Sequence, residues 1–227
     1  LLFYQQFGIS GIVLGYSVSF FPFIFLMYRG FKESKIDFSI LKEKTVFMTN
    51  NYVTHVLKII NLNIDKLIVF PLLGTAILGP YQLGFQIFSL AMVLPNIVMA
   101  YTLPHDAIGT KNTNIKKYAF YLSTVITIIT ILFSPIIIPQ ILPQFEESIQ
   151  VIQIMSLAFI PSSLSILYSS ELLGSERSKV ILIGTIISIF ILSIGIVVLG
   201  SNYGLLGITI SFVLAKIGEF IFLYIKK

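Results

Sequence analysis

Seven stretches of about 20 mainly apolar residues follow one another along the chain, separated by short polar segments. They cover residues 9–28, 53–74, 80–103, 118–140, 149–173, 180–199 and 204–225. A helix needs about 20 apolar residues to cross a bilayer, and these runs are continuous, unlike the short alternating segments of an outer-membrane barrel. The pattern therefore predicts an all-α integral membrane protein with about seven transmembrane helices.

The connections between these runs carry positive charge on one side only. Twelve of the 15 Lys and Arg residues lie in alternate connections: Arg29, Lys32, Lys35, Lys42, Lys44, Lys111, Lys116, Lys117, Arg177, Lys179, Lys226 and Lys227. The other side has no Lys or Arg, and its acids are Glu146 and Glu147. Because cytoplasmic loops are enriched in Lys and Arg, we expect a multi-pass protein of the cell membrane. Its N-terminus would lie outside and its C-terminus in the cytoplasm.

Composition excludes the main alternatives to a membrane protein. Hydrophobic residues make up 56% of the 227 positions and charged residues 11%, whereas soluble domains carry about 25% charged residues. Such hydrophobicity also excludes disorder. The net charge of +5 is explained by the topology, so we expect no nucleic-acid partner. Cysteine is absent, which excludes disulfides and thiolate chemistry.

One long polar segment interrupts the apolar runs, at residues 30–46. It is predicted to be cytoplasmic and to contain a short interfacial amphipathic piece, with Ile36, Phe38, Ile40 and Leu41 as its apolar contacts.

Five ionisable residues fall inside the predicted spans. They are Lys58, Asp65 and Lys66 in the second span and Lys216 and Glu219 in the last. Each ionised side chain near a helix centre costs about 2.5–3.5 kcal/mol on the insertion scale, so five that faced lipid would cost roughly 12–17 kcal/mol. We therefore expect these groups to face an interior cavity and to serve function.

The polar residues of the second span share one face of the predicted helix. Asn51, His55, Lys58 and Asp65 fall within a narrow arc, flanked by Asn61 and Lys66. In the last span, Lys216 and Glu219 are i, i+3 neighbours that can pair. The predicted cavity residues are Asn51, His55, Lys58, Asn61, Asp65, Lys66, Lys216 and Glu219.

Structural alternatives stay open for some of these groups. Lys58 could extend its ammonium group to the cytoplasmic surface. Lys216 and Glu219 could form an ion pair that only holds helices together. His55 could be an interfacial residue near the membrane boundary.

Motifs typical of enzymes are absent. The sequence has no G-x-S-x-G, H-E-x-x-H or G-x-x-x-x-G-K-[ST] motif, no acidic metal cluster and only two histidines. We expect no enzymatic activity, no metal site and no cofactor, with a membrane-embedded enzyme as the alternative.

A family resemblance rests on residues 61–103, NLNIDKLIVFPLLGTAILGPYQLGFQIFSLAMVLPNIVMAYTL. An acid–base pair (Asp65-Lys66) lies within a helix, and a Leu-Gly step (Leu73-Gly74) and a turn containing Gly79 and Tyr81 precede the next helix. This region resembles the start of the C-terminal lobe in polysaccharide (O-antigen) flippases of the multidrug/oligosaccharidyl-lipid/polysaccharide exporter superfamily. Pro80, between the glycine and the tyrosine, departs from that pattern.

The resemblance implies two six-helix lobes joined by a cytoplasmic linker. Residues 1–29 would then be the last helix of the N-terminal lobe, residues 30–46 the linker, and residues 47–227 the C-terminal lobe. The rest of the N-terminal lobe would be missing. A chain that begins Leu-Leu-Phe fits the expectation of a fragment.

The resemblance also implies a function: flipping of a polyprenyl-diphosphate-linked oligosaccharide by alternating access, for lipopolysaccharide or another surface polysaccharide. Lys58, Lys66 and Lys216 would supply positive charge for the anionic headgroup. Asp65 and Glu219 would hold these lysines or exchange H⁺ or Na⁺. Expected partners are the lipid bilayer, the lipid-linked oligosaccharide, the missing N-terminal lobe and proteins of polysaccharide assembly such as a glycan polymerase. The alternatives are an ion-coupled multidrug exporter and a membrane-embedded glycan-modifying enzyme.

Overall fold

The structure is a computed structural model that describes residues 2–33, 44–108 and 113–227. Every regular element in these ranges is helical, which confirms the all-α class. The chain divides into an N-terminal unit, Leu1–Lys44, and a C-terminal unit, Thr45–Lys227. The predicted amphipathic piece, with Ile36, Phe38, Ile40 and Leu41, lies outside the described residues.

The N-terminal unit consists of α1 (Leu2–Ser19) and α2 (Phe21–Glu33). Pro22 lies in the first turn of α2, where the missing N–H has no helical partner to lose. The stretch Val13–Lys32 is long and apolar enough to cross a membrane, and large side chains such as Phe21 and Phe25 are exposed along it. This apolar exposure is typical of a helix whose surroundings are lipid or other apolar helices.

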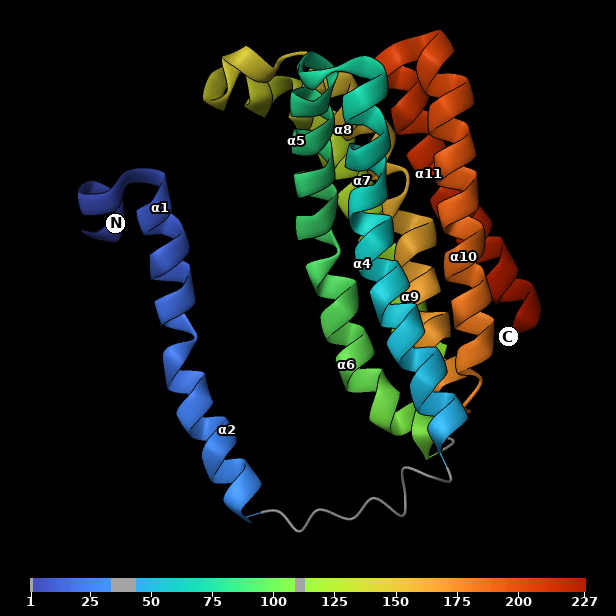
Figure 1. Ribbon diagram of the computed structural model, residues 1–227. Coiled ribbons are helices and arrows are strands. Elements are labelled where there is room, and N and C mark those ends of the chain that lie inside the picture. The colour runs from blue at the N-terminus through green and yellow to red at the C-terminus, as the bar shows by residue number, and fades with distance from the viewer. Residues whose placement is uncertain (1, 34–43, 109–112) are drawn as a thin grey trace. The chain divides into compact units, whose positions relative to one another are not determined.

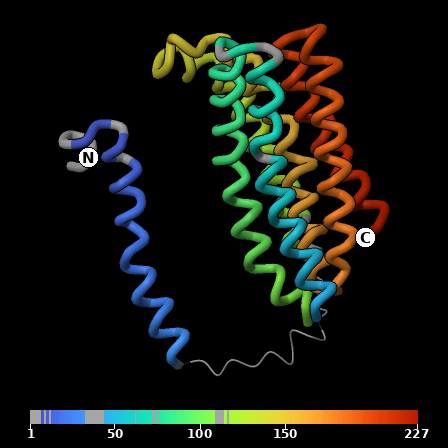
Figure 2. Tube along the Cα trace, viewed as in Figure 1, coloured from blue at the N-terminus to red at the C-terminus, as the bar shows by residue number. Residues whose placement is uncertain are grey.

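The C-terminal unit is a helical bundle. Its elements are α4 (Thr45–Leu73), α5 (Thr75–Ala91), α6 (Val93–Ala107), α7 (Thr113–Ile141), the 3₁₀ turn Pro143–Phe145, α8 (Ser148–Ser156), α9 (Phe159–Gly174), α10 (Ser178–Gly195), the π-helical turn Ile196–Gly200 and α11 (Ser201–Lys226). Within this unit α4, α10 and α11 lie side by side, and α6 packs against α9 (Figures 1 and 2).

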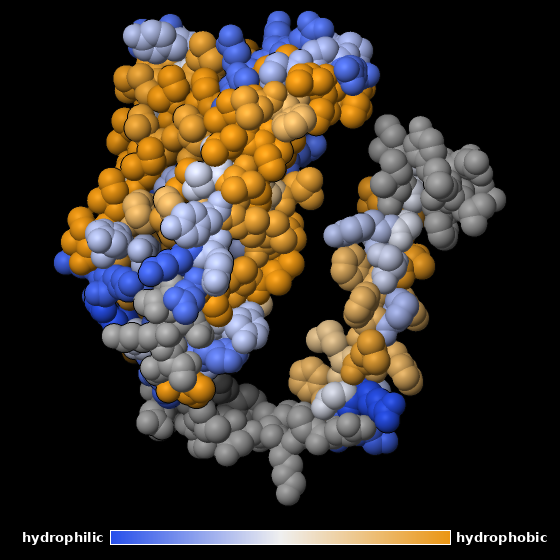
Figure 3. All heavy atoms as spheres, turned by 180° about the vertical axis from the view of Figure 1, so that it is seen from behind, coloured by the Kyte–Doolittle hydropathy of each residue, from blue (hydrophilic) through white to orange (hydrophobic). Residues whose placement is uncertain are grey.

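Four helical stretches of the described chain are long and apolar enough to cross a membrane. They are Val13–Lys32, Ala76–Ala107, Lys117–Ile141 and Ser178–Lys226, with α8 and α9 together as a fifth that is bent by 41°. A broad hydrophobic surface lies between hydrophilic groups at the two ends of the C-terminal unit (Figure 3). A multi-pass membrane protein is therefore confirmed.

The number of spans predicted from the sequence, seven, is larger than the four or five that helix length and composition support. The stretch Ser178–Lys226 doubles back on itself, because α10 and α11 pack against each other along their length (Figure 1). The 29-residue α4 is long enough to cross, but Lys58, Asp65 and Lys66 lie within it. The full count, like the orientation in the membrane, stays a prediction.

Proline explains where two of the spans are interrupted. Pro95 cannot donate a hydrogen bond to the carbonyl of Ala91, where α5 ends, and Pro161 cannot donate to that of Leu157, directly after α8. Gly74, with a φ of 81°, provides the left-handed residue that separates α4 from α5. Both proline interruptions lie in the middle of the bundle, beside the cavity described below.

Glycine allows a close approach of α9 to α6. Near this contact the Ser170 hydroxyl donates a 2.6 Å hydrogen bond to Oδ2 of Asp106, and Thr102 lies 3.1 Å from the same hydroxyl. A Cβ at Gly174 would lie 2.8 Å from the carbonyl carbon of Asp106 and 2.9 Å from the amide nitrogen of Ala107. Only a residue without a side chain fits at Gly174.

We expect Gly174→Ala to lower stability by about 1–3 kcal/mol, because the clash involves backbone atoms that cannot rotate away. Gly79→Ala is the matched control, since its Cβ would lie 3.8 Å from the ring of Phe145, an ordinary contact. Thermal unfolding of the detergent-solubilised protein measures both. Equal midpoints for the two variants would contradict the close approach.

Candidate functional site

The C-terminal unit contains a cavity of about 320 Å³ among α4, α5, α6, α9 and α11. Most of the residues that line it are polar or charged: Lys58, Asn61, Phe88, Ser89, Met92, Asn96, Ser162, Ser165, Ile166, Ser169, Lys216 and Glu219. Polar groups inside a membrane-spanning bundle are costly unless they are paired or wetted. The cavity therefore brings together polar and charged side chains that would be unfavourable in contact with lipid.

An ion pair on α11 forms one wall of this cavity. Lys216 Nζ lies 3.5 Å from Glu219 Oε2, and the two side chains are only 16% and 13% exposed. Lys216 Nζ also lies 5.7 Å from the ring centroid of Phe212, one turn earlier on the same helix. The i, i+3 pairing predicted from the sequence is confirmed, and the pair faces the cavity.

Lys58 of α4 is a third charged residue of the cavity lining, and part of this residue is exposed. Its ammonium group is attracted by Glu219 and repelled by Lys216. Two lysines and one glutamate therefore contribute to a single electrostatic environment, with a formal excess of one positive charge.

A stripe of serines on α9 lines another part of the cavity. Ser162, Ser165 and Ser169 are spaced three and four residues apart, which places them on one face of the helix. Ser165 donates a 2.9 Å hydrogen bond to the Pro161 carbonyl. Ser162 is 7% exposed, and within the described part of the chain its Oγ has no hydrogen-bond partner.

Asp65 and Lys66 lie outside the residues that line this cavity. Asp65 is fully buried: Tyr81 donates a 2.7 Å hydrogen bond to its Oδ2, and the backbone N–H of Lys66 donates one of 2.8 Å to its Oδ1. Lys66 Nζ lies 4.6 Å from the ring centroid of Phe85, a cation–π distance. The carboxyl thus joins α4 to α5 across the turn at Gly74.

An aromatic cluster lies between the Asp65 group and the cavity. Phe85, which contacts Lys66, has its ring 6.3 Å from that of Phe88, which lines the cavity. Phe88 stacks on Phe159 at 5.5 Å and meets Phe212 edge-on at 4.9 Å. The interior therefore changes from polar to apolar at this aromatic cluster of Phe85, Phe88, Phe159 and Phe212.

The structure brings together four of the eight predicted cavity residues: Lys58, Asn61, Lys216 and Glu219. Asn51 is half-buried and His55 is exposed, both nearer the start of α4 than the cavity, and neither lines it. Asn61 also donates a 3.3 Å hydrogen bond to Ser188 of α10. A single arc of α4 meets different neighbours along its length, which is why the predicted stripe divides into separate environments.

Several lining residues were not among those predicted, namely Ser89, Asn96, Ser165 and Ser169. The three- and four-residue spacing of the α9 serines was the available signal. Uncharged hydroxyl groups are common at helix–helix contacts in membranes, so that signal does not distinguish a cavity wall from a packing surface.

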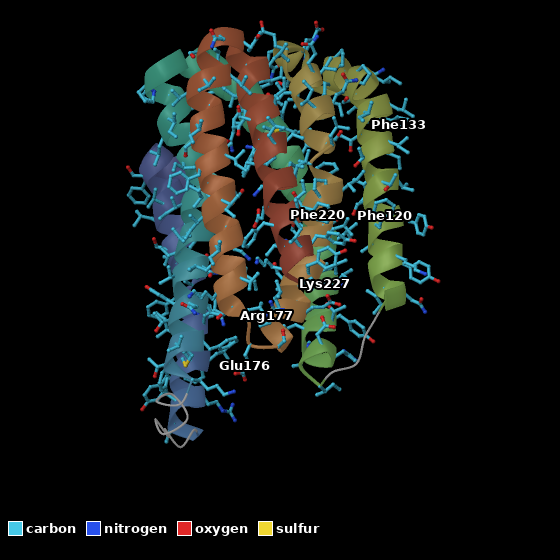
Figure 4. The ribbon with its side chains drawn as sticks, turned by 90° about the vertical axis from the view of Figure 1, so that its right-hand side faces the viewer. Phe120, Phe133, Glu176, Arg177, Phe220 and Lys227 are labelled. Atoms are coloured by element: carbon cyan, nitrogen blue, oxygen red, sulfur yellow. The ribbon has the colours of Figure 1, made fainter. Side chains whose placement is uncertain are left out.

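A second ionic cluster lies near the junction of α9 and α10. Lys227 Nζ is 3.3 Å from Glu171 Oε2 and 4.7 Å from the ring centroid of Tyr168, and Arg177 donates a 2.8 Å hydrogen bond to the carbonyl of Lys226. Arg177 and Lys227 lie toward one end of the unit, whereas Phe120 and Phe133 project outward from α7 (Figure 4). This cluster fixes the end of α11 against α9 and α10.

The described residues contain no group of three His, Asp or Glu side chains arranged to hold a metal ion. In comparisons with protein-family models, curated proteins and solved structures, no match to the chain was found. The family resemblance of residues 61–103 therefore stays a prediction.

We expect Tyr81→Phe to lower the free energy of unfolding by about 1–3 kcal/mol, because it removes the hydroxyl that satisfies the buried carboxyl of Asp65. Tyr203→Phe is the control, since Tyr203 is 67% exposed. Thermal or denaturant unfolding in detergent measures both variants. A loss in the control that matches the loss in Tyr81→Phe would contradict this role.

Proposed function

We propose that this chain takes part in moving a lipid-linked oligosaccharide across the cell membrane by alternating access. The observation that carries the proposal is a cavity lined by polar side chains, with an excess of one positive charge, inside a helical bundle whose surface is apolar. Sugars and phosphates cannot cross hydrocarbon unshielded, since each polar group that loses its hydrogen bonds costs several kcal/mol. A transporter of such molecules must provide a polar chamber.

The chemistry of the lining suits both parts of this substrate. The serine and asparagine side chains of Ser89 and Asn96 can donate and accept hydrogen bonds with sugar hydroxyls. Lysines favour a phosphate or diphosphate group. The choice of this substrate class comes from the resemblance of residues 61–103 to polysaccharide flippases, which is a prediction from the sequence.

The position of the cavity suits a mechanism in which access alternates. Ser165 and Ser169 lie toward the end of α9 that leads to the basic residues Arg177 and Lys179, the side predicted to be cytoplasmic. The aromatic cluster lies on the other side of the chamber. A chamber bordered by apolar rings on one side is what a one-sided access state requires.

A cation exporter would need a different lining. Cationic drugs favour carboxylates, whereas the cavity offers two lysines for one glutamate. The multidrug alternative therefore has less support from the site chemistry.

We expect Lys216→Ala to reduce transport at least about tenfold, because the change removes a cavity cation and leaves the Glu219 carboxylate without its partner. The assay reconstitutes the protein in vesicles with a fluorescent polyprenyl-diphosphate disaccharide. It follows the appearance of the sugar in the opposite leaflet with a membrane-impermeant reagent. Lys179→Ala, at an exposed position in the first turn of α10, is the matched control and should transport at the unaltered rate.

Absence of sugar transport by the unaltered chain, reconstituted together with the N-terminal lobe that the resemblance implies, would reject the proposed function. So would wild-type transport by Lys216→Ala at equal protein levels. Efflux of a cationic dye without sugar transport would instead support the multidrug alternative.

A further inference from the structure

We propose that a seam between α9 and α11 binds the headgroup of a zwitterionic membrane phospholipid with a primary ammonium group, as in phosphatidylethanolamine. Glu171 takes the ammonium group of the lipid, and Lys227 takes its phosphate. The seam consists of Tyr168, Glu171, Phe220, Tyr224 and Lys227, and none of these residues lines the cavity. Its ligand is therefore independent of the molecule that the cavity transports.

The seam lies where the apolar run of α11 ends. Ile221, Tyr224 and Ile225 are exposed, so α11 presents large apolar side chains up to its last turn. Lys227 follows this run, and Figure 4 shows it nearer the end of the unit than Phe220. Tyrosine is enriched at the boundary between membrane and water, and lysine extends its ammonium group toward water there. The seam therefore has the composition expected at the level of lipid headgroups.

Three rings form one aromatic surface in the seam. Tyr168 of α9 stacks on Phe220 of α11 with 6.1 Å between the ring centroids. The ring of Tyr224 lies 5.9 Å from that of Tyr168 and 6.0 Å from that of Phe220. The faces of aromatic rings attract ammonium groups, and aromatic sites that bind choline-like ligands use this attraction.

An ammonium group of the chain already occupies this position. Lys227 Nζ lies 4.7 Å from the ring centroid of Tyr168 and 3.3 Å from Glu171 Oε2. The Lys227 side chain is 42% exposed, and an ion pair with such access to solvent contributes little to stability, so its partners can exchange. Arg177, which donates a hydrogen bond to the carbonyl of Lys226, holds the end of α11 during such an exchange.

A zwitterionic headgroup exchanges partners with this ion pair and leaves no charge uncompensated. The lipid ammonium replaces that of Lys227 beside Glu171, and the lipid phosphate accepts a hydrogen bond from the released lysine. An anionic headgroup would pair with Lys227 but would leave Glu171 close to a second negative charge. A choline headgroup would keep the contact with the rings but has no N–H to donate to the carboxylate. The seam therefore favours a primary ammonium group.

The test uses the absence of tryptophan from the sequence. Tyr224→Trp places a single indole in the seam, and Phe133→Trp places one on an exposed position of α7 toward the other end of the unit (Figure 4). Each full-chain variant is reconstituted in mixed phospholipid vesicles. Fluorescence quenching by brominated phosphatidylethanolamine, phosphatidylcholine or phosphatidylglycerol then measures which lipid lies beside the indole. We expect phosphatidylethanolamine to be enriched roughly two- to fivefold over the other two at Tyr224→Trp and not at Phe133→Trp.

Substitutions in the Tyr224→Trp background test the individual roles. Glu171→Gln removes the partner of the lipid ammonium and leaves Lys227 without this carboxylate, so the preference should move from phosphatidylethanolamine to phosphatidylglycerol. Glu176→Gln, an equal charge change at an exposed position between α9 and α10, is the matched control and should keep the original preference. Tyr168→Leu should reduce the preference about twofold or more, whereas Tyr168→Phe keeps the ring and should retain it.

Equal quenching by the three lipids at Tyr224→Trp would overturn the site, as would an unchanged preference in a folded Glu171→Gln variant. Enrichment of phosphatidylglycerol at Tyr224→Trp would indicate an anionic lipid and reject the exchange of partners. Unfolding midpoints in detergent separate a lost preference from lost folding. Native mass spectrometry of the unaltered protein needs no substitution, and it should retain phosphatidylethanolamine in preference to the other two lipids. Equal retention of all three would contradict the proposal.

Discussion

The cost of placing a charge or an unpaired polar group in hydrocarbon is the constraint on which the rest of this structure depends. It explains why the candidate membrane spans expose apolar side chains and why the charged groups of α4 and α11 gather in two places. Lys58, Lys216 and Glu219 share the cavity, whereas Asp65 is satisfied by Tyr81 and its own helix. The same cost that makes these residues conspicuous in the sequence determines where the fold can place them.

The two environments differ in what their polar groups can do. The carboxyl of Asp65 accepts hydrogen bonds within the protein on both oxygens and is fully buried, so it ties α4 to α5. The charged residues that line the cavity differ, because two lysines and one glutamate leave a formal excess of one positive charge. The aromatic cluster around Phe88 keeps the two apart.

Local rules made part of this structure predictable from the sequence. Helical class and the Lys216–Glu219 pair depend on spacing along one segment, and both were predicted correctly. Lys58 and the α9 serines line the same cavity because of the way the helices pack. Neither the periodicity nor the charge pattern of the sequence contains that information. The Asp65–Tyr81 hydrogen bond depends on the turn at Gly74, so the pattern of polar residues on α4 alone could not predict it. Identification of a cavity was within reach, but the identity of its full lining was not.

The proline interruptions give the chamber a mechanical property. Ser89 and Asn96 lie on either side of the α5–α6 break, and Ser162 follows the α8–α9 break by four residues. At each break a helical hydrogen bond is already missing, because proline has no N–H to donate. At these two positions the segments on either side can tilt without rupturing a further backbone bond, and both positions lie beside the cavity.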